Sequence, residues 1–256
     1  MSSVRRFVIP IAFYLAVIVV WEIYGLSLTN PSSALVPPST ILDTLWTNRA
    51  AFLLNTGTTL AEAAAGLAVA IVVSVVLALV VDRFRLVGEG IYRLALVIYA
   101  IPLIALAPAL VAALGLGVAS KIAIAALGAY FPILVNLTSA LRTLDPRVDE
   151  LGRVLAMGYF SSLFRLRAPA VVPSFFSSLK IAGPAAFIAA IIAEWIGAES
   201  GLGLAMMHAM FGYQMAELWA ILLVATVVNG LIVLVFDLAG RWASPWHASS
   251  ERKTEV

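Results

Sequence analysis

Residues 60–81 read LAEAAAGLAVAIVVSVVLALVV and contain a single charged side chain, that of Glu62. An apolar run of this length suits a helix that crosses the hydrocarbon core of a bilayer, which takes about 20 residues at about 1.5 Å each. Five further runs have a similar character: 7–26, 91–114, 119–141, 171–196 and 218–238. The sequence therefore predicts an all-α, polytopic membrane protein with six transmembrane helices in one membrane domain.

The composition excludes a water-soluble globule. Hydrophobic residues make up 62% of the 256 residues and charged residues 12%, against about 45–50% and about 25% in soluble domains. The absence of cysteine excludes disulfides and thiolate metal sites. The two histidines, His208 and His247, are too few and too scattered for a metal cluster. We expect no metal site, and nothing in the sequence indicates nucleic-acid binding.

A loop and a short helix are expected between the first two spans. The prolines Pro31, Pro37 and Pro38 exclude a span from residues 29–40. Apolar residues then recur at helical spacing beside polar ones, which predicts one short amphipathic helix at the membrane interface. Its apolar positions are Ile41, Leu42, Leu45, Trp46 and Leu53.

The basic residues predict the orientation, because positively charged loops stay in the cytoplasm. If the N-terminus is cytoplasmic, 14 of the 16 Lys and Arg residues lie on the cytoplasmic side, and only Arg49 and Lys121 fall outside. Both termini are therefore expected in the cytoplasm.

The longest cytoplasmic connection, residues 142–170, is expected to form two short amphipathic helices. Asp145 can cap the first helix and Pro146 suits its first turn. Leu151, Val154 and Leu155 give an apolar face, and Met157-Gly158 breaks the helix. A second face, Phe160, Leu163 and Phe164, continues until Pro169 and Pro173 interrupt it. This connection is too apolar for a simple linker, so it predicts a surface on which a partner docks.

The same connection resembles the coupling motif of binding-protein-dependent ABC importer permeases, E-A-A-x3-G-x9-I-x-L-P. Glu150, Ala156, Leu166 and Pro169 stand at the acidic, glycine, isoleucine and proline positions, at the spacing of the family. Leu151-Gly152 replaces the two alanines, Ala156 the glycine and Ala168 the leucine. The resemblance implies that contact with an ATPase is made by Glu150, Leu151, Gly152, Ala156, Met157, Gly158, Leu166 and Pro169.

The resemblance covers roughly residues 55 to 246 and is most similar to the nitrate/sulfonate/taurine permease subfamily. It is carried by IPLIALAP (101–108), GLG (115–117), AYFPILVN (129–136), Ala193-Glu194 with GLG (201–203), and Pro245-Trp246. It implies a type I ABC importer permease, with a cytoplasmic coupling helix between the fourth and fifth spans. It also implies a multi-pass protein of a prokaryotic plasma membrane that works with an extracytoplasmic solute-binding protein and cytoplasmic ATPase subunits.

The chain itself is not expected to be an enzyme. It contains no Gly-x4-Gly-Lys-Ser/Thr loop, so ATP and Mg would be bound by the partner subunit, and this chain has no catalytic residue and no cofactor of its own. One chain offers one coupling segment, which predicts a homodimer of permeases with two ATPase copies, since two-fold dimers are the commonest assembly of identical chains. A second, non-identical permease is the alternative.

Polar residues within the spans are candidates for the substrate pathway, because such groups are costly in a bilayer. They are Asn136, Ser139, Ser177, Ser178, Glu194 and Asn229. The alternative for each is a hydrogen bond between helices, worth about 0.6 kcal/mol on average; for Glu194 we favour such a structural role. Glu62 is expected to be solvated or paired near the end of its span.

Two other classes of membrane protein fit the sequence less well. An ion-coupled secondary transporter needs ionisable residues deep in the membrane, whereas the charges here cluster at the span ends. A membrane-embedded enzyme needs a reactive constellation within the spans, and we find none. The favoured function is import of a small polar solute by alternating access. The resemblance implies nitrate, a sulfonate, a carboxylate or a thiamine-precursor pyrimidine as that solute.

Overall fold

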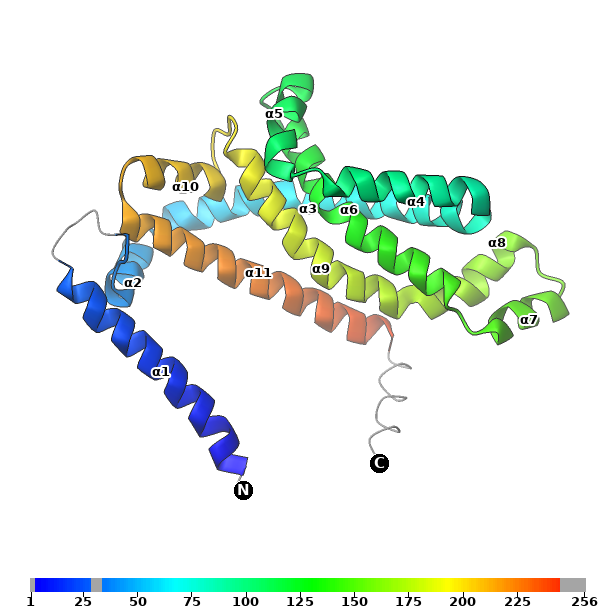
Figure 1. Ribbon diagram of the computed structural model, residues 1–256, viewed down its shortest axis with the longest axis horizontal. Coiled ribbons are helices and arrows are strands. Elements are labelled where there is room, and N and C mark those ends of the chain that lie inside the picture. The colour runs from blue at the N-terminus through cyan, green and yellow to red at the C-terminus, as the bar shows by residue number, and fades with distance from the viewer. Residues whose placement is uncertain (1–2, 29–33, 245–256) are drawn as a thin grey trace. The chain divides into compact units, whose positions relative to one another are not determined.

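A computed structural model describes residues 3–28 and 34–244 (Figure 1). Pro31, Pro245, Trp246 and His247, which the sequence singled out, lie outside these residues. The described chain is helical throughout and contains no strand. In order, its elements are α1 (Ser3–Ser27), α2 (Pro38–Thr47), α3 (Arg49–Arg83), α4 (Arg85–Ala100), α5 (Leu103–Leu114), α6 (Val118–Arg142), α7 (Pro146–Val154), α8 (Tyr159–Ser162), the π-helical turn η1 (Leu163–Arg167), α9 (Ala168–Glu194), α10 (Leu202–Phe211) and α11 (Met215–Ala243).

Five helical stretches are long and apolar enough to cross a membrane: α1, α3, α6, the continuous stretch Tyr159–Glu194 that comprises α8, η1 and α9, and α11. A sixth span is obtained when α4 and α5 are counted together, although they are bent by 98° at the break between them. The predicted all-α chain with six apolar segments is thereby confirmed for the described residues.

The break between α4 and α5 divides the span that we expected over residues 91–114. Ile101 has φ −69° and ψ 126°, so it leaves the helical region directly before Pro102. A residue that precedes proline is driven towards extended backbone by the proline ring, which also lacks an N–H for the helix. The predicted continuous helix is therefore two helices.

The interfacial helix also differs from its prediction. α2 begins at Pro38, whose missing N–H needs no partner in the first turn of a helix. It ends at Thr47, and α3 starts directly after Asn48. Leu53, expected in the same amphipathic helix as Ile41, therefore belongs to α3.

The chain divides into two compact units. The first comprises Met1–Thr58 and Glu199–Val227. Within it the Trp21 and Trp219 rings lie 5.3 Å apart, and the Ser39 hydroxyl donates to Glu22 at 2.6 Å. The second unit comprises Thr59–Ala198 and Val228–Val256 and contains residues 142–170.

The core of the second unit lies where α6 and α9 run side by side (Figure 1). Small residues allow this close approach: a Cβ added to Gly128 would lie only 2.7 Å from the Cβ of Ala189. Larger apolar side chains, such as Ile133, Leu134 and Phe187, are completely buried around this contact. Residues 142–170 therefore connect two helices that are packed tightly against each other.

Candidate functional site

The first helix of residues 142–170 begins and ends at defined caps. As predicted, Asp145 caps α7 by accepting a hydrogen bond from the Arg147 N–H at 2.9 Å, and Pro146 takes the first helical position. At the other end, Ala156 has φ +49°. Its N–H donates to the Arg153 carbonyl at 3.0 Å, and the Met157 N–H donates to the Gly152 carbonyl at 2.9 Å. This pair of bonds is the Schellman arrangement, which usually has glycine at the residue with positive φ.

Ala156 occupies the position where the coupling motif has glycine. The positive φ explains why the motif prefers a residue without a Cβ there. The predicted break at Met157-Gly158 is confirmed, because α7 ends at Val154 and α8 begins at Tyr159.

The prediction that Pro169 interrupts the second amphipathic helix was wrong. α8 continues through η1 into α9, and both Pro169 and Pro173 lie within α9. Across the turn the Ala168 N–H donates to the Leu163 carbonyl, five residues earlier. A proline ring clashes with the carbonyl four residues before it in a regular α-helix, and the wider π-helical turn relieves that clash.

An exposed apolar patch covers the outside of residues 142–170. It consists of Leu151, Val154, Leu155, Phe160 and Phe164, and Val154 alone is 82% exposed. Glu150 and Pro169 are exposed as well, whereas Met157 and Leu166 are half-buried. Gly152 is buried, and a Cβ added there would lie 3.1 Å from the Ser162 Oγ, so α7 packs closely on α8. The motif positions thus divide between the patch and its support.

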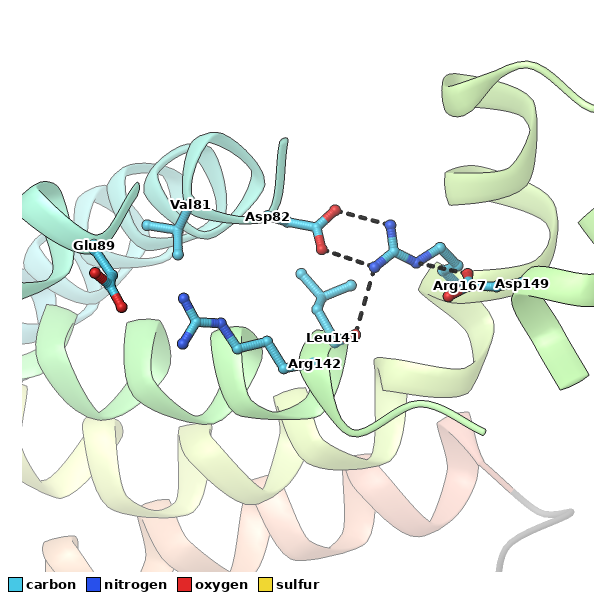
Figure 2. Close-up of a pocket in the computed structure, with 7 residues that line it drawn as sticks. All are labelled: Val81, Asp82, Glu89, Leu141, Arg142, Asp149 and Arg167. Carbon is cyan, nitrogen blue, oxygen red and sulfur yellow. Dashed lines mark hydrogen bonds and ion pairs between the residues drawn. The ribbon is translucent and has the colours of Figure 1, made fainter. Parts of the chain in front are cut away.

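Arg167 connects this support to the spanning helices. Its guanidinium donates to both carboxylate oxygens of Asp82, at 2.7 and 2.8 Å, and to the Leu141 carbonyl at 3.4 Å (Figure 2). The Arg167 and Asp82 side chains are only 13% and 11% exposed. Asp149 of α7 lies 3.8 Å from the Arg167 Nε. One side chain therefore contacts α3, α6 and α7.

Tyr159 makes further contacts beside the Asp82–Arg167 ion pair. The Tyr159 hydroxyl donates to Asp82 at 3.0 Å, and the Arg83 guanidinium lies 5.3 Å from the centre of the Tyr159 ring. A pocket of about 630 Å³ lies beside the ion pair, as Figure 2 shows. It is lined by Val81, Asp82, Glu89, Leu141, Arg142, Asp149 and Arg167. Sequence reasoning missed this cluster, although an aspartate in the last turn of an apolar helix was a signal that a cation lies nearby.

The predicted pathway residues come from three helices and do not form one cluster. Asn136 donates to the Pro132 carbonyl at 2.8 Å, and Ser178 to the Phe175 carbonyl at 2.6 Å, so both are used within their own helices. Ser139 and Ser177 are exposed on α6 and α9. Asn229 of α11 is half-buried. None of these residues lines the pocket in Figure 2.

Glu194 belongs to a separate buried polar cluster. It is fully buried at the end of α9 and accepts a hydrogen bond from the Thr59 hydroxyl at 2.7 Å. Glu62, expected to be solvated or paired, is only 5% exposed, and its Oε2 has no hydrogen-bond partner among the described residues. Lys121 is also buried and donates to the Leu116 carbonyl at 3.0 Å. The described residues contain no group of three His, Cys, Asp or Glu that could hold a metal ion.

The chain matches one protein family over residues 70–248, described as binding-protein-dependent transport system inner membrane component. A formylaminopyrimidine transport permease protein of Halalkalibacterium halodurans is 34% identical over 194 residues, which cover 76% of this chain and 78% of the relative. A nitrate import permease protein of Synechocystis is 25% identical over 178 residues, covering 70% and 63%.

Solved structures share the fold. The chain of an inward-facing methionine ABC transporter, MetNI, superposes with a TM-score of 0.65 at 16% identity, covering 75% of this chain and 96% of that one. A chain of an amino acid ABC transporter crystallised with histidines gives a TM-score of 0.61 at 13% identity, covering 77% and 94%.

Proposed function

The chain belongs to the binding-protein-dependent transport system inner membrane components and is a permease subunit of an ABC importer; from this premise we propose that residues 142–170 dock on a cytoplasmic ATPase. ATP and magnesium are bound and used by that partner, and this chain receives the resulting movement.

The exposed apolar patch carries this proposal. α7 has nine residues, among them Asp149 and Glu150, so it is too short and too polar to cross a bilayer. Leu151 and Val154 are exposed on α7, and exposed apolar side chains on a helix that does not span the membrane indicate a protein interface. Phe160 and Phe164 extend the patch onto α8 and η1, at the start of the helical stretch Tyr159–Glu194. Its support is preformed, because the caps of α7 and the contacts of Gly152 and Arg167 fix the backbone beneath it. A preformed surface loses less conformational entropy when it binds.

The test is ATPase binding after Phe160→Ala in the full complex. Truncating a phenylalanine that is buried on binding removes about 1.5–3 kcal/mol, so affinity for the ATPase should fall about tenfold or more. Phe13→Ala is the matched control, since Phe13 is 65% exposed, against 71% for Phe160, but lies on the apolar helix α1. Unchanged affinity in Phe160→Ala, measured in nanodiscs, would contradict docking through the patch.

The proposed assembly has two copies of this chain and two ATPase copies. Each chain has one segment of residues 142–170, and identical chains most often pair about a two-fold axis. Purification through a tag on this chain, followed by native mass spectrometry, should give the two-plus-two complex. One copy beside a different permease would replace the homodimer by a heterodimer.

The proposed orientation places both termini and residues 142–170 in the cytoplasm. The support is the distribution of Lys and Arg, of which 14 of 16 fall on that side. Because the chain has no cysteine, single cysteines give a clean signal. Ser161→Cys should be labelled only from the cytoplasm and Ser200→Cys only from outside.

The proposed cargo is a small polar solute that a solute-binding protein delivers outside the membrane and that crosses by alternating access. The similarity to the formylaminopyrimidine permease supports a thiamine-precursor pyrimidine over the anions. The deciding experiment is mass-spectrometric identification of the ligand that copurifies with the cognate solute-binding protein. An anion such as nitrate or a sulfonate would overturn the pyrimidine assignment.

A further inference from the structure

The last turn of α3 carries a charge that a helix alone disfavours. Asp82 is the penultimate residue of α3, where the carbonyl groups of the helix already create negative potential. A nearby cation offsets this unfavourable interaction of a carboxylate with the helix end. Arg167 does so with two parallel hydrogen bonds, and Tyr159 adds a third.

The geometry of this contact restricts movement more than a single charge pair would. The guanidinium is a rigid planar fork, so two parallel bonds to one carboxylate fix direction as well as distance. Both side chains are largely buried, with 13% and 11% of their surface exposed, which reduces the competition from water for these hydrogen bonds. Arg167 is the last residue of η1, so the fork fixes the end of the turn that leads into α9.

α3 is tied to the same continuous helical stretch at a second point. Thr59, near the other end of the α3 residues in this unit, donates to Glu194, the last residue of α9. Between the two ties, the Ser74 hydroxyl donates to the Tyr130 carbonyl of α6 at 2.7 Å. A displacement at Asp82 is therefore shared along α3 and with α6.

We propose that the Asp82–Arg167 pair is the positioning contact that makes residues 142–170 and α3 move as one body when the docked ATPase changes conformation. The inference rests on the proposed docking function. It assigns to Asp82 and Arg167 a role in passing movement to the spanning helices, distinct from the role of the exposed patch in binding the ATPase.

Spin labels test this inference without a transported solute. One label is placed on α3 at Val76, which is exposed, and one on α8 at Ser161, in a chain that has no native cysteine. The complex is held in nanodiscs with its ATPase and diluted with unlabelled chain, so that most complexes carry one labelled copy. The distance is measured by pulsed electron paramagnetic resonance without nucleotide and after trapping with Mg-ATP and vanadate.

With the native pair, the mean Val76–Ser161 distance should be the same in both states. Asp82→Asn leaves the patch residues and the caps of α7 in place, so it should still bind the ATPase and hydrolyse ATP, with weaker binding because Arg167 loses its partner beneath the patch. On trapping, its mean distance should shift by several ångströms and its distance distribution should broaden. Glu89→Gln is the matched control: Glu89 lines the same pocket, yet its pairing with Arg93 at 3.9 Å is exposed on both sides. It should behave as the native chain.

Arg167→Lys provides a second variant, because lysine keeps the charge and loses the fork; it should also give a state-dependent distance. The inference is overturned if the native distance itself shifts on trapping, or if Asp82→Asn and Arg167→Lys both keep it fixed. If Asp82→Asn fails to assemble, Arg167→Lys alone decides between these outcomes. A native chain that retains no ATPase refutes the docking function itself and is recognised before any label is introduced.

Discussion

Replacing Ala156 by glycine should stabilise the turn that ends α7. An L-residue with left-handed backbone loses roughly 1–2 kcal/mol through the clash of its Cβ with the carbonyl group, and Ala156 has φ +49°. Glycine removes this clash but makes the unfolded chain more flexible, which opposes the gain by about 0.4–1 kcal/mol. The net stabilisation is about 0.8 kcal/mol, so local opening of the turn should become about fourfold rarer.

Hydrogen exchange with mass spectrometry measures that opening directly. The reporter is the Met157 N–H, which closes the turn on the Gly152 carbonyl and is protected only while the cap is formed. Ala170→Gly is the control, because Ala170 is exposed and lies in the regular backbone of α9. There glycine should destabilise the helix by about 1 kcal/mol and accelerate exchange about fivefold.

The two variants remove the same methyl group and change the unfolded chain equally. The difference between them therefore isolates the native φ at Ala156. If Ala156→Gly accelerates exchange at Met157 as Ala170→Gly does in α9, the reasoning from the positive φ is refuted.

Substitutions of Glu150, Gly152 and Asp237 test three other contacts. Glu150→Lys reverses the charge on an exposed surface close to Arg153 and should uncouple ATP hydrolysis from uptake. Unchanged uptake of the identified ligand at normal protein levels would contradict a role for Glu150 in coupling. In the double variant Gly152→Ala with Ser162→Ala, the new methyl group no longer meets the Ser162 Oγ at 3.1 Å, and alanine replaces a helical glycine. The stability of α7 should therefore increase by about 0.5–1 kcal/mol, measured as slower amide exchange. Gly152→Ala alone should increase it less. Asp237→Asn removes the carboxylate that lies 2.9 Å from both Lys180 and Arg241 and should lower the thermal midpoint of the complex. An unchanged midpoint would show that solvent screens these ion pairs.

The helices themselves could be predicted because their signal is local. An apolar run such as residues 60–81 predicts both the length of a helix and its membrane environment. Asp145 followed by Pro146 indicates the start of a helix within two residues. The resemblance of residues 142–170 to a coupling motif located the candidate site for the same reason, since its positions lie at a fixed spacing.

The contacts that hold the site together could not be predicted, because their partners are distant in sequence. Asp82 and Arg167 are 85 positions apart, and several arginines were available to either. The π-helical turn depends on how Pro169 is accommodated between two packed helices, which no local pattern expresses. The burial of Glu62 could not be predicted for the same reason, because its position near the end of a span does not indicate which distant residues cover it.

The small side chains between α6 and α9 determine how this chain can change shape. Gly128 of α6 and Ala189 of α9 are so close that a Cβ at Gly128 would lie 2.7 Å from that of Ala189. Sliding or axial rotation of either helix would therefore bring their atoms into collision. We expect the two helices to tilt together as a rigid pair during transport, with the opening and closing of the pathway produced by the angle between such pairs.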